Sequence, residues 1–252
     1  MIHGLYLSTS GSLMQMARQE AIANNIANAS TTGFKQDVMV MQQTQTQAKR
    51  KHINPSQLNK VAEQVGGSVM LEGSYTLHGQ GAGKVTNNPL DVMVSGSGFI
   101  EVSDGFKTYY TRAGSFSRDI NGALVTKDGK YKILSNQGSE ILVNGNDIVI
   151  DKDGLVSVDG NAVGQIGIVD FEDYTKLKKM GDNLYDNQNA GLKASDDFTL
   201  ESGMVEGSNV SIVKEMVKMI EGQRAYEANM KMITAQDDTL QKTVNDVGRI
   251  PS

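Results

Sequence analysis

The chain has 252 residues with a formal net charge of -5, 27 glycines, three prolines, 13 methionines and no cysteine. A sequence without cysteine excludes disulfides, thiol catalysis and thiolate metal sites, and its acidic balance argues against nucleic acid or an anionic membrane as the main partner. No apolar run approaches the roughly 20 residues that a membrane-spanning helix needs.

The first predicted element is a helix over residues 2 to 28. Polar residues dilute its apolar stripe, so the helix would be marginal alone and needs a partner. The chain begins with Met1 to Leu5 (MIHGL), with no basic segment and no apolar core before a small-residue cleavage site, so we expect no ordinary signal peptide. Either the protein stays inside, or a route that leaves the chain uncut exports it. The apolar residues at or near helical spacing are Ile2, Leu5, Met16, Ala23 and Ile26.

Residues 31 to 88 are poorly periodic and predict an extended or conditionally ordered connector. Glutamine and threonine alternate from 42 to 47, a basic run follows from 48 to 52, and glycines punctuate the remainder. We expect short strands near Ser68 to Leu77. Such a segment usually folds against something, here a neighbouring subunit.

Residues 89 to 206 predict an inserted antiparallel β domain, because short apolar runs alternate with tight-turn signals. Asn-Gly and Asp-Gly pairs supply the positive backbone angles that two-residue hairpins require. The predicted strands are 91–94, 99–102, 123–126, 131–134, 148–150, 155–158 and 165–169. The turn signals end at Gly105, Gly122, Gly129, Gly145, Gly154 and Gly160.

Residues 209 to 247 predict one long helix, because apolar residues return at alternating steps of four and three, as in a coiled-coil seam. The helix should end before Gly248, with Pro251 preventing its continuation. The apolar positions are Ile212, Met216, Met219, Tyr226, Met230, Ile233, Leu240, Val244 and Val247.

This helix would span about 58 Å, longer than the diameter of ~46 Å of a compact ball of this chain length. Its stripe therefore needs cover from another helix, of this chain or of neighbouring chains. Gln223 and Asp237 interrupt the stripe. They are either exposed gaps or buried polar residues that fix register and partner number, and we favour the second interpretation.

The chemical motifs give no support for an enzyme, a cofactor or a metal ion. His3, His52 and His78 lack a spacing that would gather metal ligands. The pair Asp196-Asp197 has no flanking nucleophile or base and is interpreted as solvated. No nucleophile elbow or catalytic triad is visible in the sequence. We therefore expect a protein that acts by assembly or binding.

Two loops resemble ligand sites only superficially. Residues 79–84 partly match a phosphate loop, but the first glycine is missing and Val85 replaces the magnesium-binding hydroxyl; we interpret the segment as a hinge. Residues 151–154 resemble part of a calcium loop, yet Val149 and Gly160 occupy positions that need ligating side chains. This second segment is interpreted as a turn.

Both ends of the chain resemble the bacterial flagellar axial proteins, which build rod and hook. The run from Ala21 to Asn28 (AIANNIAN), followed by Thr32 to Lys35 (TGFK), is similar to the N-terminal signature of that family. The run from Val205 to Val210 (VEGSNV) and residues 223–229 (QRAYEAN) are similar to its C-terminal signature. The segment 110–116 (YTRAGSF) resembles the β domain of the rod proteins, so the likeness covers most of the chain.

The resemblance implies a structural rod subunit with an α+β fold. Its long terminal helices (1–30 and 207–252) would pair as a coiled-coil-like stalk and form an inner tube. The connector (31–88) and the inserted antiparallel β domain (89–206) would lie outside that tube, and the rod would transmit torque from motor to hook. The single rod-type domain and the ending at residues 247–250 favour the proximal over the distal rod protein.

The resemblance also implies the partners and the interface. Expected partners are copies of the chain, other rod subunits, the flagellar type III export apparatus, and hook and ring components. The expected location is the flagellum basal body in the periplasmic space, reached without signal cleavage. The implied assembly residues are Asn24, Asn25, Ile26, Asn28, Gly33, Phe34, Ile212, Met216, Met219, Gln223, Tyr226, Met230, Ile233 and Leu240.

Two other classes of protein remain open from the residues alone. One is a secreted adhesin or glycan-binding β domain on a helical oligomerisation stalk. The other is an enzyme, such as a muramidase-like factor that opens the cell wall for the rod. No catalytic acid in a recognisable setting supports the enzyme.

Overall fold

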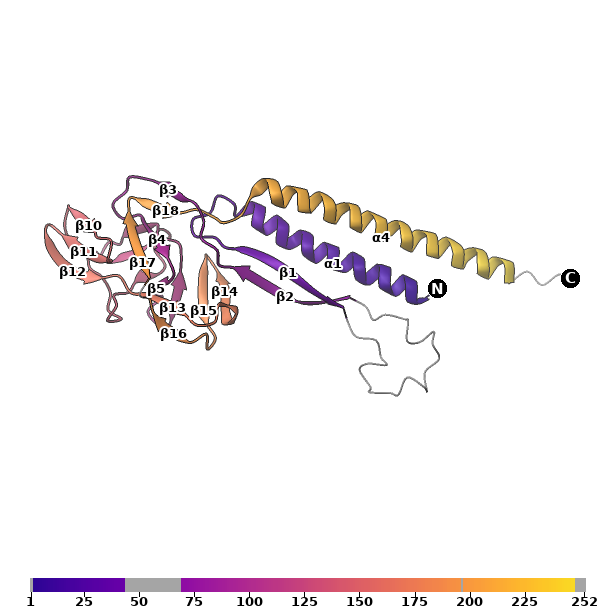
Figure 1. Cartoon of the computed structure of the whole chain (residues 1–252), viewed down its shortest axis with the longest axis horizontal. Helices are drawn as coiled ribbons and strands as arrows, with labels where there is room; N and C mark the ends of the chain where they lie inside the picture. Colours follow the sequence, from indigo (N-terminus) through magenta and orange to yellow (C-terminus); the bar gives the residue numbers. More distant parts are fainter. Residues whose placement is uncertain (1, 44–68, 196, 248–252) are drawn as a thin grey trace. The chain divides into compact units, whose positions relative to one another are not determined.

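The computed structural model describes residues 2–43, 69–195 and 197–247. The chain divides into two compact units (Figure 1). The helical unit comprises 1–26, 37–75 and 212–252, and the β unit comprises 27–36 and 76–211. Residues 31–36 and 76–88, which the sequence placed in a connector, therefore belong to the β unit.

Two long helices confirm the strongest sequence patterns. Helix α1 spans Ile2–Ala27 and helix α4 spans Ile212–Val247. Glu215 lies in the first turn of α4, where a negative charge is favourable for the helix dipole. The predicted stop at Gly248 lies outside the described residues. Together with many antiparallel strands, these helices confirm the α+β class.

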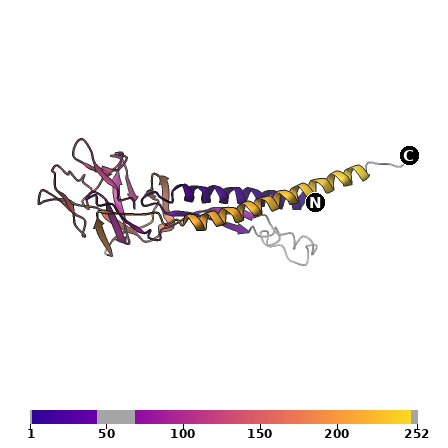
Figure 2. The same ribbon diagram turned by 90° about the horizontal axis from the view of Figure 1, so that it is seen from above.

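Within the helical unit, α1 and α4 lie side by side and run in opposite directions (Figures 1 and 2). Strand β1 (Gln36–Gln43) pairs with strand β2 (Val69–Leu77) in a two-stranded sheet. The strand near Ser68 to Leu77 was predicted, whereas β1 was not. The basic run at 48–52 and most of the glutamine-threonine run lie outside the described residues.

The β unit is built from antiparallel pairs. A nine-stranded sheet has the order β14-β15-β6-β5-β9-β8-β7, and β13 joins β16 to β5. Its strands are β5 (Phe99–Ser103), β6 (Thr108–Thr111), β7 (Phe116–Arg118), β8 (Leu124–Thr126), β9 (Lys132–Ile133), β13 (Ile168–Phe171), β14 (Leu177–Gly181), β15 (Leu184–Asn187) and β16 (Leu192–Ala194).

Three smaller sheets complete the unit. One contains β10 (Ile148–Ile150), β11 (Leu155–Val158) and β12 (Asn161–Gln165). The second pairs β4 (Val92–Gly96) with β17 (Phe198–Ser202), and the third pairs β3 (Gly83–Val85) with β18 (Met204–Glu206). A short 3-10 helix, η2, spans Tyr174–Lys176.

The hairpin signals were good predictors of backbone geometry. Gly105, Gly122, Gly129, Gly154 and Gly160 have positive φ angles of 93°, 80°, 72°, 84° and 81°. Gly145 is not among the positive-φ residues; its lack of a side chain is needed for packing instead, because a Cβ there would come 2.3 Å from Val158 Cγ1. The tight turns thus join the strands as the sequence predicted.

The β unit buries an apolar core within one chain. Val92, Ile100, Val102, Leu124 and Ile133 belong to its main cluster, and their exposed fractions are all 0%. A second cluster is aromatic, with edge contacts in which Phe99 meets Phe171 and Tyr185 at ring-centroid distances of 5.6 and 5.4 Å. Each fully buried large side chain stabilises the fold by about 1.5–3 kcal/mol.

The helical unit corrects the sequence analysis on which faces are buried. In the single chain, Leu13 and Met16 of α1 are 62% and 45% exposed, while Ser12 and Asn25 are buried. On α4, Gln223 and Asp237 are exposed, so neither is a buried register residue within the chain. The buried residues of α1 thus include polar side chains as well as the apolar Met14 and Ile22, and four residues of the predicted α4 stripe, Met219, Tyr226, Ile233 and Leu240, are half-buried.

Candidate functional site

The N-terminal and C-terminal signatures meet inside the β unit. The Gly33 backbone N–H donates to the Glu206 carbonyl oxygen at 2.8 Å, which fastens the loop after α1 to the end of β18. We call the residues gathered around this bond the signature junction. They are Gly33, Phe34, Lys35, Arg112, Glu206 and Asn209.

A buried ion pair forms the centre of the signature junction. Lys35 Nζ lies 2.5 Å from Glu206 Oε1, and the two side chains are 1% and 0% exposed. Lys35 also donates to the Gly79 carbonyl at 2.9 Å, and the Gly81 N–H donates to Glu206 Oε1 at 2.7 Å. These extra bonds offset part of the large cost of removing both charges from water.

Arg112 brings a second cation to the same carboxylate. Its Nη1 lies 3.6 Å from Glu206 Oε2, and the guanidinium donates to the carbonyls of Val94 and Gly96 at 3.2 and 2.9 Å. Burial lowers the pKa of Arg112 and of Lys35, and in both the Glu206 carboxylate opposes that shift. One buried carboxylate therefore holds two cations, from distant parts of the chain.

Phe34 and Gly33 pack tightly beside these charges. Phe34 is 3% exposed, and Lys179 Nζ lies 3.8 Å from its ring centroid, a cation–π geometry. Gly33 has a φ of 68°, and a Cβ there would come 2.4 Å from the Ala113 backbone nitrogen. Only glycine fits a left-handed position with backbone that close.

Asn209 joins three segments of the junction by hydrogen bonds to backbone. Its Oδ1 accepts from the Gln36 N–H at 2.8 Å, and its Nδ2 donates to the carbonyls of Leu77 and Gly79 at 2.8 and 3.0 Å. Its own N–H donates to the Phe34 carbonyl at 3.3 Å. The segments at 34–36, 77–79 and 206–209 are thereby held together by one side chain.

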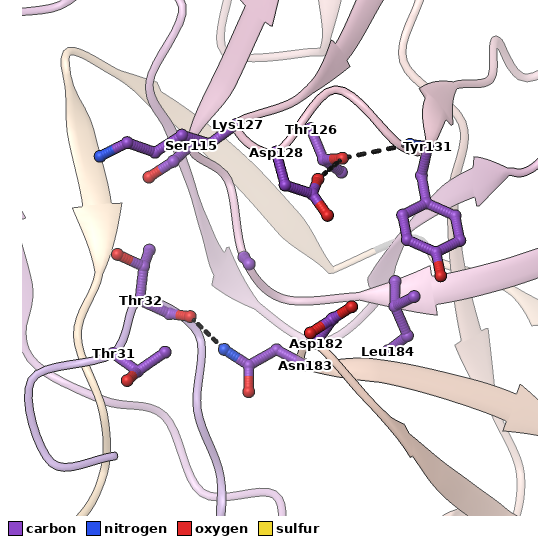
Figure 3. Close-up of a pocket in the computed structure, with 11 residues that line it drawn as sticks. Thr31, Thr32, Ser115, Thr126, Lys127, Asp128, Tyr131, Asp182, Asn183 and Leu184 are labelled. Atoms are coloured by element: carbon purple, nitrogen blue, oxygen red, sulfur yellow. Dashed lines mark hydrogen bonds between the residues drawn. The ribbon is translucent and has the colours of Figure 1, made fainter. Parts of the chain in front are cut away.

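A cleft of about 270 Å³ opens next to the loop that carries Thr31 and Thr32 (Figure 3). Asn183 Nδ2 donates to the Thr32 carbonyl at 2.7 Å, and the Thr126 hydroxyl bonds to the Asp128 carboxylate. The remaining labelled residues of the lining are Ser115, Lys127, Tyr131, Asp182 and Leu184. Most of the lining surface is nevertheless apolar, so these side chains do not make the cleft a polar site.

The structure places the predicted asparagines in different environments. Asn25 is 1% exposed; it donates to the Asp37 carbonyl at 2.8 Å and accepts from the Asp37 N–H at 3.0 Å. Asn28 Oδ1 accepts from the Thr31 hydroxyl at 3.2 Å. Asn24 is exposed and Ile26 is half-buried. Asn25 thus ties α1 to β1 within the chain, and the predicted role of all four in assembly stays a prediction.

The predicted residues of α4 divide between two faces. Met219, Tyr226, Ile233 and Leu240 are half-buried, whereas Ile212, Met216, Gln223 and Met230 are exposed. Exposed apolar side chains gather in the first turns of the helix, a feature that we call the α4 apolar patch. Its members are Ile212, Val213, Met216, Val217 and Ile220, which are 46%, 73%, 52%, 51% and 53% exposed.

Contiguous exposed apolar surface of this kind marks an interaction site. The sequence pattern predicted part of this patch through Ile212 and Met216. It missed Val213, Val217 and Ile220, which lie beside the stripe on the helix surface. It also missed the junction residues Lys35, Arg112, Glu206 and Asn209 as a site, although the two signatures contain all but Arg112.

Neither a metal centre nor a membrane span is found in the described part of the chain. No group of three or more histidine, aspartate or glutamate side chains there could hold a metal ion. None of its helices is both long and apolar enough to cross a membrane. The junction and the α4 apolar patch are therefore the features on which a function can be argued.

Comparisons with known proteins agree with both signatures. Models of three families match: "Flagella basal body rod protein" at residues 5–35, "Flagellar hook protein FlgE/F/G D1 domain" at 93–158, and "Flagellar basal body rod FlgEFG protein C-terminal" at 201–246. The first and third of these contain the residues of the signature junction that come from the two ends.

Full-length relatives give the same result. The flagellar basal-body rod protein FlgG of Bacillus subtilis is 35% identical, and the alignment covers 97% of this chain and 99% of the relative. FlgG of Caulobacter vibrioides is 36% identical over 96% and 98%, and FlgF of the same bacterium is 34% identical over 99% and 100%. The chain therefore belongs to the flagellar basal-body rod protein family, whose members are structural proteins of the flagellum and not enzymes.

Proposed function

We propose that this rod subunit assembles through its terminal helices into a helical tube that transmits torque from the motor to the hook. The observation that carries the proposal is the α4 apolar patch. A single chain leaves it in water, whereas the β unit buries its own core. Burial of the patch against neighbouring subunits would make assembly favourable.

The contrast between the exposed α4 apolar patch and the buried core of the β unit assigns a different role to each part of the chain. In this proposal the terminal helices (1–30 and 207–252) pair as a coiled-coil-like stalk and line the tube. The segment 31–88, of which 31–36 and 76–88 lie in the β unit, connects them to an outer β domain at 89–206. The exposed residues Ile212, Met216, Gln223 and Met230 face neighbouring subunits, and the half-buried ones face the partner helix of the same chain.

The position along the rod is proposed from the sequence of the chain. The ending at residues 247–250 and the single rod-type β domain favour the proximal rod, with the distal rod as the alternative. The relatives carry two names, FlgG and FlgF, at identities of 36% and 34% in the same bacterium, so identity alone gives no preference. Deleting the chromosomal copy and imaging the truncated rods by electron microscopy would separate the two positions.

The proposed partners are copies of the chain, other rod subunits, the flagellar type III export apparatus, and the hook and ring components. The proposed location is the periplasmic part of the basal body, reached by export without cleavage. Mass spectrometry of the mature protein from purified basal bodies tests this, since an intact N-terminus is expected. A shortened N-terminus would overturn uncleaved export.

Assembly is tested by electron microscopy and sedimentation over a concentration series. We expect helical oligomers from the full chain and none after deletion of 209–252. Met216→Asp should prevent assembly as well, because a charge in a surface that becomes desolvated is costly. Gln241→Asp is the matched control, since residue 241 is exposed and polar and the change adds the same charge. Equal assembly of both variants would contradict the proposal.

A further inference from the structure

The contact between α1 and α4 contains polar side chains seated on glycines. A Cβ added to Gly4 would lie 2.9 Å from Gln236 Nε2, and a Cβ added to Gly11 would lie 3.1 Å from Asn229 Nδ2. Each amide therefore occupies the space that a side chain on α1 would need. Two glycines seven residues apart receive two amides that are also seven residues apart.

A looser contact, within ordinary van der Waals range, occurs with the helices exchanged. A Cβ on Gly222 of α4 would lie 3.6 Å from Gln15 Oε1 and 3.7 Å from Gln19 Cγ, both on α1. One further layer is a hydrogen bond, in which Asn25 Nδ2 donates to Glu215 Oε2 at 3.2 Å. Asn25 and Glu215 are 1% and 2% exposed, so this bond is well shielded from water.

All these layers obey one antiparallel register. In the pairs Gly4 with Gln236, Gly11 with Asn229, and Asn25 with Glu215, the two residue numbers total 240. Gly222 fits the same rule, because its level on α1 is position 18, between Gln15 and Gln19. On α4 the layers recur every seven residues, which is two helical turns.

The apolar residues of this face cannot by themselves define that register. Met219, Tyr226, Ile233 and Leu240 also recur every seven residues. A slip of one heptad, about 10.5 Å along the axis, would therefore replace each apolar side chain by another. In one direction the slip would place Gly11 opposite Gly222 and leave a gap.

In both directions the slip would separate Asn25 from the buried Glu215 carboxylate. The polar layers therefore discriminate between registers that the apolar layers tolerate. They add little stability of their own, because the buried Oε1 atoms of Gln15 and Gln236 have no hydrogen-bond partner among the described residues.

We propose that this glycine–amide ladder, Gly4, Gly11 and Asn25 on α1 with Glu215, Gly222, Asn229 and Gln236 on α4, sets the register of the terminal helices. The proposal deepens the helix pairing proposed above and rests on it. Buried polar groups are well attested as register determinants in paired helices. The ladder takes the role that the sequence had suggested for Gln223 and Asp237, one position earlier in each heptad.

Pairs of introduced cysteines test the register in the full chain, which has no cysteine of its own. A disulfide between Leu7→Cys and Ile233→Cys reports the register in which the paired residue numbers total 240. Leu7→Cys with Tyr226→Cys, or with Leu240→Cys, reports a slip of one heptad. A slipped pair lies beyond the Cα separation of about 4.4–6.8 Å that a disulfide allows, so its oxidation should be at least about tenfold slower.

The ladder itself is tested by repeating the oxidation with Gly11→Leu, which fills the space of the Asn229 amide. The rate of disulfide formation between the cysteines at positions 7 and 233 should fall several-fold, and the rate for one of the slipped pairs should rise. Thr9→Leu, an exposed change on the same helix, is the control and should alter neither rate. Because leucine could unfold α1, Asn229→Leu provides a second variant that removes the amide from the other helix.

The outcomes separate the ladder from the proposed function. Equal closure of all three cysteine pairs, or no effect of both leucine variants, would overturn the ladder while leaving assembly untouched. If none of the three cysteine pairs forms a disulfide, the helices do not pair in the free chain, and the inference is overturned. Loss of assembly with the register of 240 retained would count against the rod proposal alone.

Discussion

The two units of this protein differ in how completely they bury their apolar side chains. In the β unit, Ile100, Val102 and Leu124 are 0% exposed within one chain. In the helical unit, glycines and amides of α1 and α4 lie against one another, while Val213 and Val217 are 73% and 51% exposed. The β unit thus buries its core within the chain, whereas the helical unit leaves apolar side chains exposed.

In the proposed function, this difference separates the part of the chain that is stable before assembly from the part that gains stability on assembly. A self-contained unit keeps the subunit folded before assembly, since its buried apolar area is independent of neighbours. An aligned pair of helices with apolar outer faces gains most when neighbours arrive. Substitutions should therefore act on folding in the β unit and on assembly in the helical unit.

The largest effect on folding is expected at the buried ion pair. Glu206→Ala leaves Lys35 and Arg112 without their carboxylate and should lower the free energy of unfolding by about 3–5 kcal/mol. Urea unfolding followed by tyrosine near-ultraviolet circular dichroism measures this change. Glu140→Ala is the control, because it breaks an exposed pair with Lys132, 2.7 Å long, and should cost less than about 1 kcal/mol. Equal losses of unfolding free energy in the two variants would contradict the expected difference between a buried and an exposed ion pair.

The next effect is expected at Gly33. Gly33→Ala and Gly105→Ala both force a residue with a Cβ into the left-handed region, at a cost of about 1–2 kcal/mol. Only at Gly33 would that Cβ also meet backbone, so roughly 1–3 kcal/mol more should be lost there. At Gly105 nothing lies within 4 Å of the added atom. Thermal unfolding of the two variants measures this difference in stability. Similar melting temperatures would refute the close packing of the signature junction.

The same valine-to-alanine change tests the two units directly. Val156→Ala, in the β unit at 0% exposure, should cost about 1.6 kcal/mol or more, given ~0.8 kcal/mol for each buried methylene. Val217→Ala, in the α4 apolar patch, should change the free energy of unfolding by less than about 0.5 kcal/mol. It should weaken assembly instead, which sedimentation measures. A large loss of stability from Val217→Ala would show that the patch is already covered in the free chain.

The smallest effect is a pH dependence confined to the β unit. Burial and, after it, the hydrogen bond to Asp170 raise the pKa of Tyr174 to about 12. Since this pKa lies above the ordinary value of 10.0, the contribution of Tyr174 to stability is present below pH 10 and is lost as the pH rises to about 12. The phenol is partly exposed, so the loss should stay under about 1 kcal/mol.

Tyr174→Phe is the control for this titration. The stability of the unchanged chain should fall more steeply between pH 10 and about 12 than that of the variant. Tyrosinate absorbance should show one late-titrating phenol that the variant lacks. Parallel stability curves for the two chains would contradict the assignment.

Much of the fold was predictable from local sequence patterns. The long apolar repeat gave α4, and Asp-Gly and Asn-Gly pairs gave most of the hairpins. Strand β14 was missed because its lysines, Lys178 and Lys179, hide any alternation. The turn that follows has Asp182 and Asn183 at positive φ in place of an Asp-Gly or Asn-Gly pair. Strand β17 carries Phe198 and Leu200 in alternation and was within reach of the same reasoning.

The buried faces of the helices and the centre of the junction were not predictable in this way. Apolar periodicity cannot detect a contact made by Gly11 and Asn229, because neither residue is hydrophobic. Lys35 and Glu206 are 171 positions apart, and a single charged residue carries no signal of its future partner. The family signatures marked both segments, but only the folded chain shows that they touch.

The position of Asn209 has a mechanical consequence. The chain passes between the two units after Ile26, Gln36, Tyr75 and Ser211. The side chain and N–H of Asn209 bond to backbone at Gln36, Leu77, Gly79 and Phe34, close to these crossings. If the proposed rod carries load through its helices, tension along the chain would reach this short set of bonds before the strands of the β core, and Asn209 would distribute it over several segments.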